Sequence, residues 1–203
     1  MKPRVLLLSL VMLGACTTGK EQPRNRTQQA ARTPDPVVVV QTNLGTITME
    51  LYPDKAPETV QNFLAHVRGG FYNGLTFHRI MPGFMIQTGE VMPDFTKHTS
   101  QATAIANENP NGLSNTRGTV AMARALDPNS AIAEWYINLV NNADKLDFRD
   151  STLQGFGYVV FGKVTSGMSV VDSIAHIPTR AYRNYPSFPT EPPVIERMYV
   201  REP

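Results

Sequence analysis

The alternation of apolar and polar residues predicts that the chain folds mainly as short β-strands from residue 37 onward. Val37–Thr42 is a β-branched run, and the turn Asn43-Leu44-Gly45 separates it from Thr46–Tyr52. This second segment alternates polar and apolar residues, as the two faces of a half-buried strand require. Further apolar segments between turn residues are also expected to be strands: Thr76–Ile80, Phe84–Gln87, Gly118–Met122, Trp135–Leu139, Tyr158–Val164 and Val194–Val200.

Two segments carry the period of an amphipathic helix instead. In the first, which begins at Glu58 and ends at Gly69-Gly70, apolar residues recur every three or four positions. These positions are Val60, Phe63, Leu64 and Val67. The second helix is expected from about Ser166 to Ala175, before Pro178, and the proline-rich segment 186–193 is expected to be a loop. Many short strands with two helices indicate a mainly β fold, a closed or nearly closed barrel whose ends the helices cover.

The first fifteen residues have the pattern of a secretory signal peptide. Lys2 and Arg4 precede the apolar run Val5–Leu13, which is too short to span about 30 Å of hydrocarbon as a helix. Leu13-Gly14-Ala15-Cys16 resembles the lipobox of bacterial lipoproteins. This resemblance implies cleavage before Cys16, lipidation of its thiol with palmitate or a related acyl chain, and a periplasmic protein. Thr17 in place of Asp favours the outer membrane of a Gram-negative bacterium. The alternative is an ordinary signal peptide with an incidental cysteine.

Composition and charge exclude several classes of protein. Lys and Arg number 19 and Asp and Glu 17, and removal of residues 1–15 takes away Lys2 and Arg4 and no acid. The remaining charges balance, so we expect no nucleic-acid partner. One cysteine excludes a disulfide framework and a cysteine-rich zinc site. The four histidines show no metal-ligand spacing, so neither a metal nor a cofactor is expected: His66, His78, His98 and His176.

The mature chain is expected to consist of a tether and one domain. Residues 16–36 contain the lipidated cysteine followed by a polar stretch without aromatic residues or hydrophobic period, which is typical of a flexible linker. Residues 37–203 show no second linker and no internal repeat. We therefore expect a single domain over 37–203, which works as a monomer beside the membrane that the lipid anchors it to.

One segment has the composition of a functional site. Phe77–Gln87 places Arg79 in an apolar β-like context, and a turn at Pro82-Gly83 folds Phe84 and Met85 back beside it. Spacing alone favours an arginine at the rim of the barrel over a binding site. The segment nevertheless resembles the signature of the cyclophilin family of peptidyl-prolyl cis–trans isomerases, most closely the periplasmic bacterial branch. The order and spacing of further blocks agree with that family: Asn107-Glu108, Asn115–Arg124 and Gly157–Val164.

The resemblance covers nearly all of residues 37–203 and implies a closed eight-stranded antiparallel barrel capped by two α-helices. It also implies the residues of the site. Arg79 matches the catalytic arginine, and Gln87 matches the glutamine that orients it. The other implied contacts with substrate are Phe84, Met85, Ala123, Arg124, Glu134, Tyr136, Leu146 and Tyr158. Glu134 stands where the family often has glutamine, and Tyr136 where phenylalanine usually closes the pocket.

The implied activity is rotation about X–Pro bonds in unfolded or partly folded exported polypeptides, which assists their folding. Such rotation moves no proton, so His78 is interpreted as a structural residue rather than a base. The departures at Glu134 and Tyr136 leave a second hypothesis open, a catalytically weak chaperone or module that binds Pro-containing peptides in the same groove.

Overall fold

Most strands of the protein belong to one antiparallel sheet, seen here in a computed structural model that describes residues 34–201. The predicted signal peptide, Cys16 and nearly all of the tether therefore lie outside the described residues. Neighbouring strands are paired in the order β10 (Ile195–Val200), β1 (Val37–Thr42), β2 (Gly45–Leu51), β7 (Val160–Ser166), β5 (Thr119–Met122), β6 (Trp135–Asn138), β4 (Met85–Thr88) and β3 (Arg79–Met81).

The sheet curls so that its two edge strands approach each other, but no continuous ladder of backbone hydrogen bonds joins them. β10 and β3 are its two edge strands, and among residues 34–201 only the segments just before them are joined. Thr76 and Val194 form a single bridge, and the amide of Ile195 donates to the carbonyl of Leu75 at 2.8 Å. The amide of Phe77 still donates to the carbonyl of Pro193 at 3.3 Å, but Pro193 has no amide hydrogen with which to continue a ladder. The structure thus shows a mainly β protein with a curled eight-stranded sheet rather than the closed barrel that we expected.

The helix α1 (Pro57–Arg68) forms where the apolar period predicted it. Its first turn is capped from far along the chain, since Glu108 accepts hydrogen bonds from the amides of Glu58 at 2.9 Å and Thr59 at 2.8 Å. These contacts satisfy amides that no helical carbonyl can reach. The predicted apolar face is buried. The centroid of the Phe63 ring lies 5.7 Å from that of Trp135 and 4.9 Å from that of Phe161. The helix is therefore held by packing against β6 and β7.

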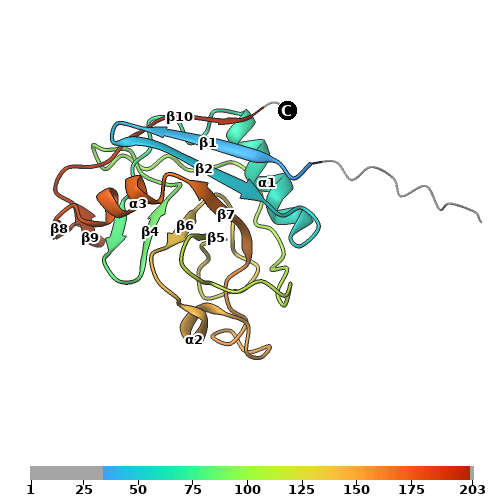
Figure 1. Cartoon of the computed structure of the whole chain (residues 1–203). Coiled ribbons are helices and arrows are strands. Elements are labelled where there is room, and N and C mark those ends of the chain that lie inside the picture. Colours follow the sequence, from blue (N-terminus) through green and yellow to red (C-terminus); the bar gives the residue numbers. More distant parts are fainter. Residues whose placement is uncertain (1–33, 202–203) are drawn as a thin grey trace, which may run out of the picture. The chain divides into compact units, whose positions relative to one another are not determined.

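Two further helices lie apart from α1, α3 beside the strands and α2 in a loop below β5 and β6 (Figure 1). The helix α3 (Met168–Ala175) matches the second prediction, although it begins later, after Gly167. Gly167 has φ of +88°, and a Cβ there would collide with the carbonyl oxygen of Thr46, so this turn requires glycine. The helix α2 (Ala143–Leu146) was not predicted, because a single turn shows no apolar period. Among residues 34–201, no helix is long and apolar enough to cross a membrane.

A separate hairpin, β8 (Thr179–Tyr182) and β9 (Tyr185–Pro189), lies between α3 and β10. The prediction of a loop over 186–193 is wrong for its first half, which is strand. The prolines of this segment argued against a strand, but a two-stranded hairpin accepts proline at positions where no amide hydrogen is needed. Aromatic packing stabilises the hairpin. The ring of Phe95 stacks on that of Tyr182, with 4.0 Å between centroids, and its centroid lies 4.4 Å from that of Phe188.

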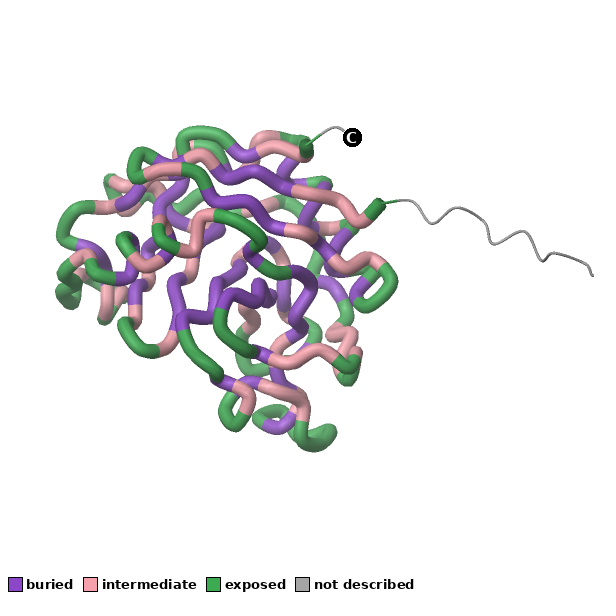
Figure 2. Tube along the Cα trace, viewed as in Figure 1, coloured by how far each residue is buried: buried purple, intermediate pink, exposed green. Residues whose placement is uncertain are grey.

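The strands place alternate side chains in two different clusters. The main core takes Ile80, Ile86, Val120 and Ile137 from successive strands, together with the apolar face of α1. Their neighbours along β4, β5 and β6 form a second, smaller cluster on the opposite face, together with one residue each of β7 and α2: Met85, Ala121, Tyr136, Val160 and Leu146. Buried residues lie along the strands and exposed ones in the loops (Figure 2). Apart from β8 and β9, which were not predicted, the observed strands differ from the predicted ones only at their ends, most at β3, which starts at Arg79 rather than Thr76.

Candidate active site

A row of paired residues crosses four strands on the face that carries the smaller cluster. Arg79 of β3 pairs with Gln87 of β4, Gln87 pairs with Tyr136 of β6, and Tyr136 pairs with Ala121 of β5. Residues paired in register point to the same face of a sheet. The sheet therefore brings a cation, an amide and an aromatic ring together from strands that are far apart in the sequence.

A chain of hydrogen bonds fixes the polar end of this row. Nη1 of Arg79 donates to Oε1 of Gln87 at 3.0 Å. Nε2 of Gln87 donates to Oε2 of Glu134 at 2.7 Å. The carboxylate accepts only, so it sets which end of the Gln87 amide faces Arg79. Glu134 thus positions Gln87, and Gln87 positions the guanidinium.

A cavity of about 210 Å³ lies beside this chain. Its lining combines the guanidinium and amide at one end with apolar and aromatic side chains elsewhere. The lining residues are Arg79, Phe84, Met85, Gln87, Ala123, Arg124, Tyr136, Leu146 and Tyr158. The structure therefore brings together every site residue that the sequence suggested except Glu134, which lines the neighbouring cavity.

The hydroxyl of Tyr136 has a partner, as a buried phenol requires. It donates to Oδ1 of Asn115 at 2.9 Å, and Nδ2 of Asn138 donates to the same oxygen at 3.1 Å. Burial, with smaller effects of Tyr158 and Asp147, raises the pKa of Tyr136 well above its usual value. Asn115 is itself buried and was not among the predicted site residues, although it lies in the Asn115–Arg124 block. Its role is visible only once the strands are paired.

Arg124 supports one wall of the cavity. Its guanidinium donates to the carbonyls of Gly157 at 2.9 Å and of Ala125, Leu126 and Leu153 at 3.0 Å. Its Cζ also lies 4.7 Å from the centre of the Tyr158 ring. The adjacent amide of Ala123 donates to the carbonyl of Glu134 at 2.9 Å, so that amide is not a donor for a peptide. Arg124 fastens the 153–157 loop and the Tyr158 ring together.

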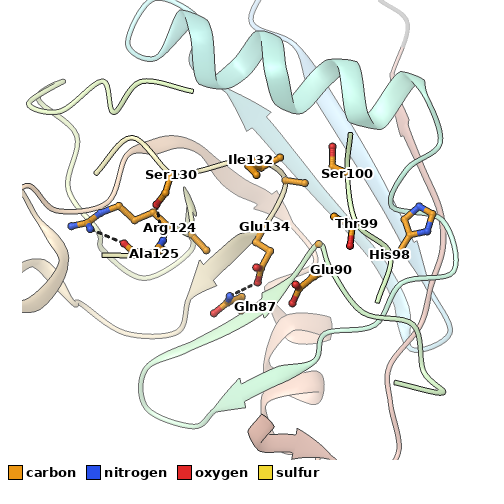
Figure 3. Close-up of a pocket in the computed structure, with 13 residues that line it drawn as sticks. Gln87, Glu90, His98, Thr99, Ser100, Arg124, Ala125, Ser130, Ile132 and Glu134 are labelled. Carbon is orange, nitrogen blue, oxygen red and sulfur yellow. Dashed lines mark hydrogen bonds between the residues drawn. The ribbon is translucent and has the colours of Figure 1, made fainter. Parts of the chain in front are cut away.

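Glu134 stands between the two cavities. The second cavity, of about 290 Å³, is lined by Glu134, Glu90 and His98 among others (Figure 3). Burial acts to raise the pKa of Glu134, but hydrogen bonds from His78 and Gln87 and the charge of Lys97 outweigh it and lower that pKa. The carboxylate is therefore ionised at neutral pH and keeps its acceptor role toward Gln87.

Comparison with known proteins identifies the fold and site. The family described as cyclophilin-type peptidyl-prolyl cis–trans isomerase/CLD matches residues 37–200. Peptidyl-prolyl cis–trans isomerase B of Escherichia coli (strain K12) is 47% identical over 166 residues, which are 82% of this chain and 100% of that protein. The chain belongs to the cyclophilin family. The predicted enzyme class, a peptidyl-prolyl cis–trans isomerase, is thereby confirmed.

Other cyclophilins support this assignment. The peptidyl-prolyl cis–trans isomerase of Acinetobacter baylyi is 44% identical over 165 residues, covering 81% of this chain and 85% of that protein. The crystal structure of a cyclophilin-type isomerase of Cryptosporidium parvum matches with a TM-score of 0.67 at 23% identity, over 83% of this chain and 99% of that one. A second structure of the Cryptosporidium protein, obtained in the presence of the dipeptide Ala-Pro, has a TM-score of 0.66. The solved structures establish the cyclophilin fold of this chain.

Proposed function

We propose that this cyclophilin accelerates rotation about X–Pro bonds in exported polypeptides, with Arg79 as the catalytic residue. The observation that carries the proposal is the position of the Arg79 guanidinium. It lies at the edge of a cavity of about 210 Å³ that Phe84, Met85 and Leu146 also line, in the orientation that Gln87 fixes. A cation held beside such apolar side chains fits a substrate in which a polar amide adjoins an apolar ring.

The chemistry follows from the electronic structure of the amide. Rotation about an X–Pro bond has a barrier of about 18–20 kcal/mol because the nitrogen shares its lone pair with the carbonyl. Twisting the bond localises that pair on the nitrogen, which then accepts a hydrogen bond. A donor placed at this nitrogen stabilises the twisted state more than either planar state, as catalysis requires. Arg79 suits this role because its N–H groups are present at every physiological pH.

The apolar side chains supply the binding energy for the proline ring. Phe84, Met85, Tyr136 and Leu146 line the cavity from three different elements and their loops. Met85 and Tyr136 are almost completely buried, at 2% and 4% exposure, so these walls are already fixed before a ligand arrives. A preformed pocket of this kind avoids the cost of ordering side chains on binding.

The structure weakens the reason for the alternative hypothesis, a binding module without efficient turnover. Glu134 still accepts the hydrogen bond from Gln87, and the Tyr136 hydroxyl is satisfied by Asn115. Neither departure from the family pattern displaces Arg79 from Gln87. We therefore favour the enzyme over the passive module.

The deciding experiment compares isomerisation of a Pro-containing peptide by the wild type, Arg79→Ala and Arg79→Lys, using exchange NMR or a protease-coupled assay. Loss of one donor that acts in the transition state is expected to lower kcat/KM by about 10²–10³-fold. Arg197→Ala is the matched control, since Arg197 lies on the exposed side of β10. A wild-type rate equal to that of Arg79→Ala would leave only the binding module.

The site of action belongs to the same proposal. The signal pattern and the lipobox-like Leu13–Cys16 segment support a periplasmic protein that acyl chains on Cys16 attach to the outer membrane. More than one acyl chain holds a protein firmly, where one chain alone binds marginally. Cell fractionation of wild type and Cys16→Ser tests this. The variant is expected in the soluble periplasmic fraction, and its retention in the membrane fraction would contradict the anchor.

A further inference from the structure

Three side chains of the types that ligate metal ions lie together at Glu134: His78, Glu90 and Glu134 itself. His78 directly precedes β3, Glu90 follows β4, and Glu134 directly precedes β6. One potential ligand atom from each lies within 4.8 Å of the other two. Glu90 and Glu134 are neighbours at the second cavity in Figure 3. The three residues are far apart in the sequence, which is why the spacing of the histidines gave no sign of them.

The histidine is buried and incompletely paired. His78 is 3% exposed, and its Nε2 lies 3.3 Å from Oε2 of Glu134. Its Nδ1 has no hydrogen-bond partner among the described residues. The ionised carboxylate of Glu134 only accepts, so without an ion the proton of His78 lies on Nε2. Because Nδ1 has no partner, the proton can move there without breaking another hydrogen bond, and Nε2 then offers its lone pair to a bound ion in place of the hydrogen bond to Glu134.

A second buried polar group points to the same place. The hydroxyl of Tyr185 has no hydrogen-bond partner among residues 34–201, and its ring meets the edge of the His78 ring at 5.6 Å between centroids. The hydroxyl beside His78 can therefore bond a water molecule that is bound to an ion. Buried polar groups without partners are rare and call for a ligand or water.

We propose that His78, Glu90 and Glu134 bind a divalent transition-metal ion of the Zn²⁺ type, and that the bound ion slows isomerisation. One imidazole and two carboxylates form a ligand set that such ions accept, with water completing the coordination. Two bonds of about 2.0–2.2 Å place ligand atoms at most about 4.4 Å apart, so the three side chains, whose ligand atoms lie within 4.8 Å of one another, need only small adjustments. Glu90 can move, because its side chain is 26% exposed.

The cation now paired with Glu90 is easily displaced. Nζ of Lys97 lies 2.5 Å from Oε1 of Glu90, but the lysine side chain is 60% exposed. An exposed ion pair of this kind contributes little to stability. A divalent ion supplies more positive charge to the two carboxylates than Lys97 does, and the lysine can turn into solvent. Lys97 therefore competes with the ion for Glu90. A variant that lacks this lysine should bind the ion more tightly.

The link to catalysis passes through one carboxylate. Oε2 of Glu134 is the acceptor both for Gln87, at 2.7 Å, and for His78. An ion that takes this oxygen weakens the hydrogen bond that orients Gln87, and Gln87 in turn loses its hold on Arg79. The binding half of the proposal stands on the cluster alone, whereas the inhibition half rests on the proposed isomerase function.

The test is calorimetric titration of ZnCl₂ into the full chain carrying Cys16→Ser, which removes the lone thiol as a competing zinc ligand. One ion per chain is expected to bind. Glu90→Gln is expected to weaken binding by at least about tenfold, because even loss of an outer-shell partner costs 10–100-fold. His78→Gln is expected to do the same, and Lys97→Gln to strengthen binding. Glu196→Gln, an exposed carboxylate on β10, is the matched control.

Spectroscopy and activity complete the experiment. Co²⁺ in place of Zn²⁺ is expected to give visible absorption bands that disappear in Glu90→Gln, even if His78→Gln does not fold. Zn²⁺ is expected to slow isomerisation by the wild type and to slow it less for Glu90→Gln. For each protein, the rate with Zn²⁺ is compared with its own rate in the presence of a chelator. Absence of zinc binding, or equal affinity of Glu90→Gln and Glu196→Gln, would overturn the site. Zinc binding without slowing overturns only the coupling, and absence of activity in chelator would instead count against the proposed function.

Discussion

Arg79 and Gln87 face each other across β3 and β4, and a 3.0 Å hydrogen bond joins Nη1 of the arginine to Oε1 of the glutamine. This bond occupies one guanidinium N–H and leaves the others to point elsewhere. Because Gln87 acts through Arg79, we expect the two residues to be strongly coupled. Gln87→Ala should lower kcat/KM by about tenfold, and should have almost no further effect in the Arg79→Ala background.

The double-mutant cycle distinguishes positioning from direct action. If Gln87 contacts the substrate independently of Arg79, the two losses in kcat/KM will add. Gln87→Glu provides a second check, because it keeps an acceptor for Arg79 but places a second carboxyl group beside Glu134. We expect Gln87→Glu to be less active than the wild type, since two adjacent carboxylates repel each other.

A buried hydrogen bond joins Tyr136 to Asn115, and its contribution to stability can be tested. Tyr136→Phe removes the hydroxyl that donates at 2.9 Å, but Asn115 keeps the donor from Asn138. We therefore expect the free energy of unfolding at pH 7 to fall by about 1 kcal/mol, the usual net value of one hydrogen bond. Isomerase activity should stay near that of the wild type, because the ring face that lines the cavity is retained.

Urea unfolding measures this change, and Tyr199→Phe is its control. Tyr199 lies on β10, at the other edge of the sheet, and is half-buried. Equal stability of Tyr136→Phe and the wild type would show that the buried hydrogen bond to Asn115 contributes nothing. A large loss of activity in the same variant would show instead that the hydroxyl takes part in the reaction.

The buried tyrosines also predict how stability depends on alkaline pH. Burial raises the pKa of Tyr72 and of Tyr136 well above 10.0. In the unfolded chain both phenols lose their protons near pH 10, while the folded chain keeps them. Above that pH the unfolded state binds fewer protons, so stability falls as pH rises, by up to about 1.4 kcal/mol per pH unit for each tyrosine.

Unfolding midpoints in urea, measured from about pH 8 to pH 11, test the sign and the source of this slope. Tyr136→Phe removes one of the two groups, so its stability should fall less steeply with pH than that of the wild type. Its deficit at neutral pH should therefore shrink in alkali. Parallel curves for the variant and the wild type would mean that Tyr136 ionises normally in the folded protein.

Local pattern was sufficient to predict the strands of the eight-stranded sheet and the two longer helices, because each depends on a period within a dozen residues. It did not reveal how the sheet edges meet, since the bridge between Thr76 and Val194 joins residues that are remote in sequence. The β8–β9 hairpin was missed because its strands are held by Phe95, which comes from another part of the chain. Long-range packing decides such elements, and periodicity does not record it.

Part of the candidate site could likewise be predicted from the sequence, and part could not. Arg79 and its pocket were recognisable from the Phe77–Gln87 segment through resemblance to cyclophilins, although the residues alone favoured an arginine at the barrel rim. Asn115 and the cluster around Glu134 were not recognisable, because each gathers partners from three or more segments. Register across β3, β4, β6 and β5 creates these groupings, and a one-residue slip in any pairing would turn them to the other face.

Arg124 offers the last prediction, on substrate binding rather than catalysis. Its guanidinium reaches four carbonyls, among them those of Leu153 and Gly157, and lies over the Tyr158 ring. Arg124→Lys keeps the charge but cannot form this planar fork. We expect the 153–157 loop to loosen and KM to rise while kcat changes little, since Arg79 is untouched. Hydrogen exchange of the loop amides should become faster, whereas the control Arg180→Lys on β8 should leave both unchanged. A fall in kcat at unchanged KM would show that Arg124 acts on the twisted amide itself.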